Sequence, residues 1–568
     1  MQMHKRPWLL AIIVIVFGSL APAAPIPASS TSRPNVILIL ADDMGFSDLG
    51  CYGGEIHTPN IDHLASQGVR FTKFYNMARC CPTRASIMTG LYPHQAGIGT
   101  MNQDLGKPAY QGELNDRCVT IAEVLSDNGY QTGMAGKWHL CHLNISPGGR
   151  AAKRQVNFEV PSDISPSKAN WPCNRGFQEH WGTIPGVEDY FDPYGLVHNE
   201  QTIKPDTKDF YYTDFITQHT VQMIDQFSAN SNPFFLYVAY TAPHWPMQAR
   251  ESDIEHYAHT YDVGWDKIRQ QRFERQVAMG IVDRSWELSP RANYPRLSEG
   301  ASVLTDWDDA PDKAWQSRRM AVYAAMIECM DRGVRQILAK LHDRNIERNT
   351  VVIFLSDNGG CAENVHPDWY DVPSKTRDGR TIHVGNDPRY TPGPQDVYQS
   401  YGPAWANASN TPFRRFKHWT EEGGISTPLI VRWPEHVKNP DRIEHGQVGD
   451  VIDLMPTILD LAHAPYPQTR LGHEIVPEEG KSLVPAFNGQ LVDRGPLFWE
   501  HEGNRAARLG DWKLIAGFRE KWQLYNLAKD RTELVDLAAQ NPQKVEELKN
   551  LYEQWAKRCG VEPWPVRR

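Results

Sequence analysis

The chain has 568 residues, of which 40% are hydrophobic and 22% charged, and its formal net charge at pH 7 is −9. This length exceeds what one compact core usually holds, so we expect two domains. The acidic balance provides no basic surface for nucleic acid, and it requires any anion site to be a local cationic pocket.

The N-terminal residues predict a secretory signal over residues 1–24. Lys5 and Arg6 precede an apolar run at residues 8–20, and small residues for cleavage follow at 21–23. The run is shorter than the roughly 20 residues that span a bilayer. We therefore expect an exported protein, periplasmic or extracellular, without a stable membrane span. Export would permit disulfides among the nine cysteines, whose pairing the spacing does not define.

Four short apolar runs predict parallel strands that are buried on both faces. Helical patterns at 60–67, 119–128 and 321–344 alternate with them, which indicates a doubly wound α/β fold. Ligands bind at the carboxyl ends of such strands, so the polar residues there point to one crevice, although Asp and Asn also favour ordinary turns. The runs and their polar groups are 36–40 with Asp42 and Asp43, 131–135 with Lys137 and His139, 234–238 with His244, and 351–355 with Asp357 and Asn358.

The segment from Cys80 to Gly90 carries a cysteine with Pro82 two residues on and Arg84 two further on. Pro82 stiffens the segment, and Arg84 places a fixed cation beside the cysteine. Taken alone, the segment also allows a vicinal disulfide between Cys80 and Cys81, or two buried thiols.

Asp42, Asp43, Asp357 and Asn358 offer only oxygen ligands. Such a set selects Ca²⁺ or Mg²⁺ over zinc. Adjacent carboxylates repel each other unless a cation or a proton lies between them, so the pair after a strand indicates a metal site. For Asp42 and Asp43 alone, a turn is the alternative.

The cations that could face this crevice are Arg84, Lys137, His139, His244 and Lys417. A lone histidine is more often structural, but His139 and His244 each follow a predicted strand. Lys417 lies in a basic segment that would also suit a solvated surface.

The region after residue 490 changes character. Alternating short runs at 497–499, 506–515 and 522–527 predict antiparallel strands, and the apolar face of 543–557 predicts a helix. We expect a catalytic domain at 33–490 and a smaller α+β domain at 491–568. Segments 142–230, 245–315 and 361–410 show weak periodicity and predict long loops. Their tryptophans could stack on sugar rings; these are Trp171, Trp181, Trp245, Trp265, Trp369 and Trp405.

In this order, and over nearly the whole mature chain, the motifs resemble those of the type I (formylglycine-dependent) sulfatase family. Asp42-Asp-Met-Gly-Phe-Ser-Asp48 and Trp499-Glu-His-Glu-Gly-Asn504 are similar to its bacterial arylsulfatase group. One departure is Cys141, where many relatives have glycine. The resemblance implies an alkaline phosphatase-like fold, with a large, mixed, mostly parallel sheet sandwiched by helices. It also implies that a formylglycine-generating enzyme converts Cys80 to Cα-formylglycine.

The resemblance further implies roles for the site residues. Asp42, Asp43, Asp357 and Asn358 would bind Ca²⁺ together with the modified Cys80. One hydroxyl of the aldehyde hydrate would attack sulfur with Asp357 as base, and the second would expel sulfate after His139 removes its proton. Arg84 and Lys137 would hold the sulfate, and His244 or Lys417 would protonate the leaving group. The expected substrate contacts are Lys137, His244, Lys417, His501 and Asn504.

The implied function is hydrolysis of sulfate esters by an arylsulfatase-type enzyme, with a sulfated carbohydrate as the natural substrate. One alternative is a formylglycine-dependent phosphonate or phosphate ester hydrolase, which would share the Cys80 segment. The other is a non-catalytic sulfoglycan-binding protein, against which the complete set of catalytic positions argues.

Overall fold

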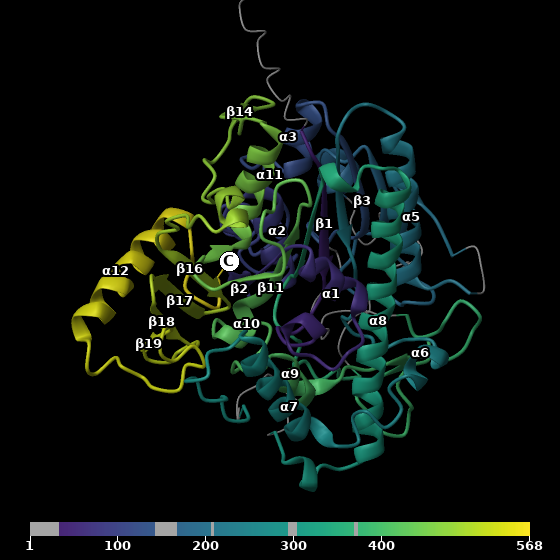
Figure 1. Ribbon diagram of the computed structural model, residues 1–568, viewed down its shortest axis with the longest axis vertical. Helices are drawn as coiled ribbons and strands as arrows, with labels where there is room; N and C mark the ends of the chain where they lie inside the picture. The colour runs from purple at the N-terminus through teal and green to yellow at the C-terminus, as the bar shows by residue number, and fades with distance from the viewer. Residues whose placement is uncertain (1–32, 143–166, 206–208, 293–303, 368–372, 568) are drawn as a thin grey trace, which may run out of the picture. The chain divides into compact units, whose positions relative to one another are not determined.

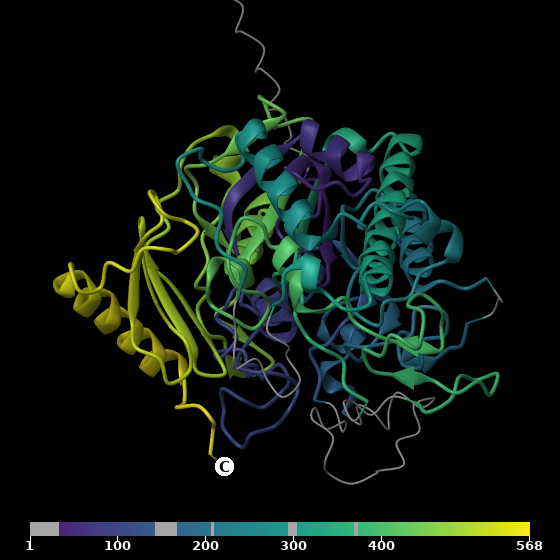
Figure 2. The ribbon, with the colours of Figure 1, turned by 90° about the horizontal axis from the view of Figure 1, so that it is seen from below.

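The computed structural model describes residues 33–142, 167–205, 209–292, 304–367 and 373–567, which belong to one compact unit (Figures 1 and 2). The predicted signal segment at 1–24 and Trp369 lie outside these residues. Every helix within the described ranges is too short or too polar to cross a lipid bilayer. All nine cysteines are described and carry free thiols, so the disulfides that export would permit are not formed here.

The centre of the fold is a mixed sheet of 11 described strands, mostly parallel as predicted. β1 pairs in parallel with β7 and β8, and β3 pairs in parallel with β7 and β4, whereas β11 runs antiparallel to both β8 and β2. The order is β12-β2-β11-β8-β1-β7-β3-β4-β5-β6, with β13 beside β2. The strands are β1 (Asn35–Ala41), β2 (Val69–Tyr75), β3 (Gln131–Lys137), β4 (Glu179–Thr183), β5 (Leu196–His198), β6 (Gln201–Thr202), β7 (Phe234–Ala239), β8 (Thr350–Ser356), β11 (Ser426–Arg432), β12 (Arg442–Glu444) and β13 (Gly449–Asp450).

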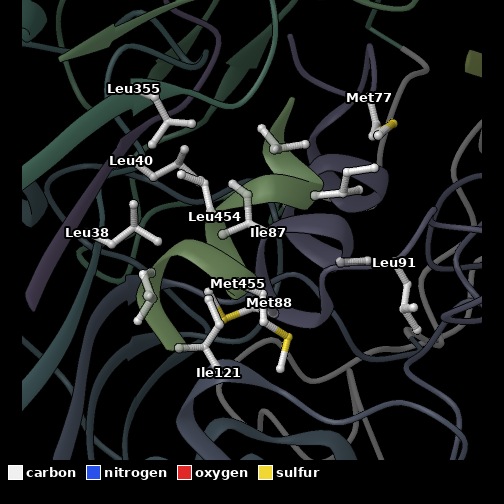
Figure 3. Close-up of a cluster of buried hydrophobic side chains, with 14 of the residues drawn as sticks. Leu38, Leu40, Met77, Ile87, Met88, Leu91, Ile121, Leu355, Leu454 and Met455 are labelled. Atoms are coloured by element: carbon white, nitrogen blue, oxygen red, sulfur yellow. The ribbon is translucent and has the colours of Figure 1, made fainter. Parts of the chain in front are cut away.

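Helices cover both faces of this sheet, because the central strands present apolar side chains on both faces. In β1, Leu38 and Leu40 pack towards α2, α3 and α11 (Figure 3), while Ile37 and Ile39 pack towards α1, α5 and α8. The helices are α1 (Pro59–Ser66), α2 (Cys80–Thr89), α3 (Ile121–Asp127), α5 (Tyr212–Ser228), α6 (Glu251–Glu255), α7 (Gly264–Met279), α8 (Lys313–Asp343), α9 (Gly402–Ser409), α10 (Glu422–Ile425), α11 (Leu454–Ala462) and α12 (Pro542–Cys559).

The C-terminal region contains the predicted antiparallel sheet and its helix. Strands β16 (Leu497–His501), β17 (Asn504–Leu509), β18 (Trp512–Ala516) and β19 (Gln523–Asn526) pair in sequence order, and α12 lies along them (Figure 2). The indole Nε1 of Trp499 donates to the carbonyl oxygen of Asn76 at 2.8 Å, and its ring meets Tyr75 edge-on. These contacts hold β16 beside the connection from β2 to α2. Two short pairs complete the strands: β9 (His383–Val384) with β10 (Val397–Tyr398), and β14 (Thr469–Arg470) with β15 (His473–Glu474).

The prediction of long loops was wrong where α5, α7 and α9 form. The buried face of α5 includes Thr213, Thr217 and Thr220, which interrupt the apolar period. The buried face of α7 includes Arg269 and Arg272, so burial there depends on ion pairs and hydrogen bonds instead of on apolar residues. For that reason, the hydrophobicity pattern of the sequence does not indicate the buried faces of α5 and α7.

The proposed sugar-stacking role is wrong for four of the five described tryptophans. Trp171, Trp245, Trp265 and Trp405 are buried, which leaves no ring face for a sugar. Trp181 is partly exposed, but its ring stacks between His198 and His219 at centroid distances of 3.6 and 3.9 Å. These tryptophans are packing residues.

Candidate active site

The predicted polar groups meet at one edge of the sheet. Asp42 follows β1, Asp357 follows β8, and Lys137 ends β3. The carboxyl end of β2 lies at the same edge and leads within five residues into α2, which begins at Cys80. The antiparallel β11 starts there, so the segment before it brings Lys417 to the site. The single crevice expected from strand topology is therefore present.

The acidic residues form a compact buried group. The side-chain amide of Asn358 donates to Asp43 Oδ1 at 2.7 Å, and the backbone N–H of Asp43 donates to Asp357 Oδ1 at 3.2 Å. Asp42 Oδ1 and Asn358 Oδ1 are buried and have no hydrogen-bond partner within the described ranges. Buried, unsatisfied hard oxygens fit Ca²⁺ or Mg²⁺, because unpaired polar atoms are costly and these ions prefer oxygen.

Basic side chains surround this acidic group. Arg84 Nη2 lies 2.9 Å from Asp357 Oδ2, and Lys137 Nζ makes a very short contact with Asp42. Lys417 Nζ lies 2.8 Å from Asp43 Oδ1. All six side chains of these pairs are at least nine-tenths buried, so their charges act on one another through a weakly screening interior.

Opposite pKa shifts follow from this arrangement. Burial raises the pKa of Asp42, but Lys137 and the neighbouring cations outweigh burial and lower it to about 2. Burial and the charge of Asp42 raise the pKa of Asp357 well above its usual range. Burial lowers the pKa of His139 to about 4, so the imidazole of His139 is neutral at neutral pH.

Cys80 occupies the first turn of α2, where backbone N–H groups favour a thiolate. A hydrogen bond from Cys81 and the charge of Lys137 hold the pKa of the Cys80 thiol well below its usual value, against the effect of burial. Cys81 keeps its proton, because burial and the Cys80 hydrogen bond raise its pKa. The two sulfurs are separate thiols and not the vicinal disulfide that the sequence allowed.

His244 reaches the group from the loop after β7. Its Nδ1 lies 2.6 Å from the carbonyl oxygen of Trp245, which can only accept, so Nδ1 carries a proton. Its Nε2 faces the site, 3.3 Å from Lys417 Nζ and 3.4 Å from Asp43 Oδ2. His244 and Lys417 therefore share one corner of the crevice.

Left-handed backbone conformations lie around the site. Asp43 has φ 67°, Ala78 62°, His139 62° and His418 88°, values that cost non-glycine residues about 1–3 kcal/mol each. Such strain is kept where a side chain must be held in one direction. A Cβ on Gly186 would lie 2.1 Å from His139 Cε1, so glycine there leaves the room that the imidazole occupies.

His501 and Asn504, which the sequence suggested as substrate contacts, approach the site through His418, the neighbour of Lys417. The Asn504 amide lies 3.2 Å from His418 Nε2, and the His418 backbone N–H donates to Ala78 at 2.7 Å. His501 meets the His418 ring edge-on and is 1% exposed, and neither of its ring nitrogens has a hydrogen-bond partner within the described ranges.

Sequence reasoning missed three residues at this edge. Arg79 Nη2 lies 2.8 Å from Glu363 Oε1, and Glu363 Oε2 accepts from the Trp245 indole at 2.9 Å. Tyr237, on β7, places its hydroxyl 3.5 Å from Arg84 Nη1. Arg79 directly precedes Cys80 and could have been noted, whereas no motif marks Glu363 or Tyr237.

The loop that contains Asp189 and Tyr190 packs against His244 and makes a pH-dependent contribution to stability. Tyr190 donates its hydroxyl to the carbonyl oxygen of His244 at 2.9 Å, and the adjacent Asp189 is fully buried. Burial raises the pKa of Asp189 from 3.8 to about 7. Between these values the folded protein keeps a proton that the unfolded chain releases, so this group's contribution to stability falls as pH rises from 4 to 7.

We therefore expect Asp189→Asn to flatten the decline of the melting temperature between pH 5 and pH 8. The amide cannot ionise, so the variant has no proton to lose over this range. Thermal melts at four pH values would test this, with the exposed Asp209→Asn as control. An unchanged slope in Asp189→Asn would show that Asp189 is ionised in the fold throughout.

Comparisons with known proteins agree with this geometry. The family model described as Sulfatase matches residues 34–464, and that of the N-sulphoglucosamine sulphohydrolase C-terminal region matches 414–558. The chain is 33% identical to an uncharacterized sulfatase of Schizosaccharomyces pombe, covering 92% of this chain and 93% of the relative. It is 30% identical to an arylsulfatase of Klebsiella aerogenes, covering 85% and 96%.

Solved structures share the fold at lower identity. Ps i-CgsB in complex with k-i-k-neocarrahexaose superposes with a TM-score of 0.62 at 24% identity, covering 92% of this chain and 93% of that one. A protein solved with its substrate D-glucosamine-2-N,6-O-disulfate superposes with a TM-score of 0.56 at 20% identity, covering 94% and 99%. The α/β sheet with its C-terminal antiparallel sheet is thus the architecture of these proteins.

Proposed function

This chain belongs to the sulfatase family and is a sulfuric ester hydrolase, and we propose that it acts on sulfated carbohydrates through a formylglycine formed from Cys80. The observation that carries the mechanism is the position of Cys80. It begins a helix at the edge where the buried carboxylates and five basic side chains converge. The proposal includes a formylglycine-generating enzyme as a maturation partner.

The chain's oxygen ligands would hold a calcium ion. Asp42, Asp43, Asp357 and Asn358 fit it because their oxygens are buried and converge, and two of them have no protein partner among the described residues. When bound, this ion would supply Lewis-acid polarisation of the sulfate oxygens. The formylglycine hydrate would supply one hydroxyl to attack sulfur and a second to release sulfate.

The basic side chains have separable tasks. Arg84 and Lys137 lie against Asp357 and Asp42, where they would orient the sulfate oxygens and offset their charge. His139 is neutral at neutral pH and can accept the proton of the second hydroxyl. His244 presents Nε2 beside Lys417 Nζ, and this pair would deliver a proton to the leaving oxygen.

Carbohydrate substrates are supported by the relatives and by the unpartnered ring nitrogens of His501. Curated relatives of this chain include N-acetylgalactosamine-6-sulfatases, and two solved structures of the same fold hold k-i-k-neocarrahexaose and D-glucosamine-2-N,6-O-disulfate. The ring nitrogens of His501 lack protein partners among the described residues, and an unmade buried hydrogen bond is costly. A sugar hydroxyl beside the scissile sulfate would satisfy one of them.

A substrate panel tests this proposal. For each substrate, kcat/KM is divided by the rate constant of the uncatalysed hydrolysis. We expect this ratio to be higher for sulfated mono- or oligosaccharides than for aryl sulfates. If no sugar sulfate is cleaved while aryl sulfates turn over efficiently, the carbohydrate assignment is wrong. Faster turnover of an aryl phosphonate than of the matching aryl sulfate would favour a phosphonate hydrolase. A fully formylglycine-bearing protein inert toward the whole panel would favour a non-catalytic sulfoglycan-binding protein.

We expect His501→Ala to raise KM for sugar sulfates about 3- to 10-fold, the usual value of one hydrogen bond, with little change for aryl sulfates. The reason is that an aryl leaving group offers no hydroxyl to the imidazole. Steady-state kinetics on both substrate classes would measure this, with the exposed His473→Ala as control. Equal losses on both classes would assign His501 a packing role.

We also propose export to the periplasm or the extracellular space, on the strength of the charged and apolar pattern of residues 1–24. Cell fractionation with N-terminal sequencing of the mature protein tests this. A cytoplasmic protein that begins at Met1 would contradict it.

A further inference from the structure

A second candidate site lies outside the catalytic group, at the start of α8. A cavity of about 460 Å³ is bounded by this helix and by the loops at 364–367 and 385–388. Its lining includes Trp315, Gln316, Arg319 and Asn364. The volume is within the range of small-ligand pockets.

Arg319 is the unusual member of this lining, because it is a buried cation without a counter-charge. It is 4% exposed, and no carboxylate forms an ion pair with it among the described residues. Its Nε donates to the Ser400 carbonyl oxygen at 2.6 Å, and its Nη1 donates to the Gln316 side chain at 2.9 Å. Its Nη2 is buried and has no hydrogen-bond partner in that part of the chain.

The guanidinium is held in place by an aromatic ring and by two hydrogen bonds. Its face lies over the Trp315 ring, with 4.2 Å between Arg319 Cζ and the ring centroid. A Cβ on Gly402 would lie 2.7 Å from Arg319 Nη2 and 3.2 Å from Asn364 Oδ1, so glycine there keeps open the space beside both atoms. Burial alone lowers the pKa of Arg319 to about 9, and the group stays charged at neutral pH.

A buried, charged guanidinium is costly unless an anion joins it. Arg269 on α7 also lacks an ion pair among the described residues, but each of its three guanidinium nitrogens donates to a protein oxygen, whereas Arg319 Nη2 does not. Among the described residues, the one acid of the cavity wall is Asp387, and Arg389 Nε donates to its carboxylate at 2.8 Å. Guanidinium groups match planar or tetrahedral oxyanions through paired N–H donors. Arg319 therefore fits a carboxylate or a sulfate that enters from the cavity.

The cavity and the catalytic crevice share one loop. Asn364, which lines the cavity, follows Glu363 directly in the chain. The Glu363 carboxylate pairs with Arg79, and although burial opposes it, the charges of Arg79, Lys417 and His244 lower the pKa of Glu363. One loop thus borders both sites, and the inference requires a substrate long enough to extend from the catalytic corner to the cavity.

We propose that the Arg319 cavity binds a second anionic group of the substrate, a carboxylate or a sulfate on the saccharide, and so selects polyanionic substrates. This inference rests on the proposed function, because it assigns a further charge to the sulfated carbohydrate. Arg319 would act in substrate binding and not in the chemistry at Cys80.

The main test compares Arg319→Gln with the wild type on three kinds of substrate. We expect kcat/KM to fall about tenfold or more, chiefly through KM, for sugar sulfates that carry a second sulfate or a carboxylate. We expect kcat/KM to change less than twofold for a monosulfated sugar without a second charged group and for an aryl sulfate. Arg335→Gln, which removes an exposed charge from the same helix, is the matched control. Equal losses on all substrates, or no loss on the dianions, would overturn the inference.

A second variant tests the inference even if Arg319→Gln does not fold. Asn364→Asp keeps the side-chain shape and brings a carboxylate near Arg319, since both side chains approach the same point beside Gly402. We expect Asn364→Asp to raise the melting temperature, because it gives the guanidinium a counter-charge. We also expect it to raise KM for dianionic substrates, as Arg319→Gln does. A higher melting temperature with unchanged selectivity would overturn the inference.

The two possible sources of the anion are separable. Disulfated and carboxylated sugars distinguish a sulfate from a carboxylate as the second group, and either result supports the inference. Calorimetric titration of the Cys80→Ala protein with inorganic sulfate tests for binding of the free ion. Binding that requires Arg319, without any preference among substrates, would make the cavity a free-anion site and contradict the inference. If the wild type cleaves no sulfate ester at all, the proposed function fails instead.

Discussion

Replacement of Cys80 by alanine should abolish sulfate ester turnover, by a factor on the order of 10⁴ or more, as loss of a nucleophile does in other hydrolases. Alanine cannot be converted to an aldehyde, and no other residue of the first turn of α2 carries proline at +2 and arginine at +4. The fold should persist, because the change removes one buried sulfur from α2, a helix that packs through Ile87 and Met88 two turns further along (Figure 3). Turnover and a thermal melt of the same preparation measure both effects.

Cys81→Ala is the matched control, since Cys81 is the adjacent buried thiol and donates to Asn102 Oδ1 at 2.9 Å. We expect it to keep activity within a few-fold of the wild type. Peptide mass spectrometry should show that Cys80, and not Cys81, has lost sulfur and gained an aldehyde oxygen. A fully active preparation with unmodified Cys80 would sink the formylglycine mechanism.

Removal of divalent metal should produce the second largest loss. We expect a chelator to lower kcat/KM by a factor on the order of 10³ and Ca²⁺ to restore it, because loss of a Lewis acid forfeits several kcal/mol of charge stabilisation. Asp43→Asn and Asp357→Asn should each be severely impaired, since the Asp43 carboxylate contacts Lys417 and the Asp357 carboxylate contacts Arg84 and accepts from the Asp43 backbone N–H.

A binding measurement independent of activity accompanies this prediction. Saturating Ca²⁺ should raise the melting temperature of the wild type. At a Ca²⁺ concentration 100 times Kd, the free energy of unfolding should rise by about 2.7 kcal/mol. Asp43→Asn should lose this shift, and the exposed Asp104→Asn should keep it. Restoration of activity by zinc alone would show that the reasoning from oxygen ligands is wrong.

The sequence by itself determined the central strands and the residues at their ends. Each strand is a short apolar run, and in β1 alternate residues such as Leu38 and Ile39 pack on opposite faces, so the signal is local. Parallel strands bring their carboxyl ends to one edge, and this rule was enough to unite Asp42, Lys137 and Asp357. The antiparallel C-terminal strands and α12 were predicted for the same local reason.

Only the tertiary structure decided where charged and aromatic residues would be buried. Arg272 is buried on α7 because Asp48 and Glu55, more than 200 positions earlier in the chain, meet it there. Trp405 is a core residue and not a sugar platform, because other aromatic rings enclose it. Burial of such groups depends on distant partners, which a local pattern does not contain.

The same reason separates the two proposed sites. The catalytic site is marked in the sequence because its chemistry needs particular residues in short, fixed spacings around Cys80 and at strand ends. The Arg319 cavity has no motif, since its character comes from a missing counter-charge and from the space beside Gly402. Short-range spacing determined the fold class and the candidate catalytic residues, whereas long-range packing decided which buried charges have a counter-charge and which do not.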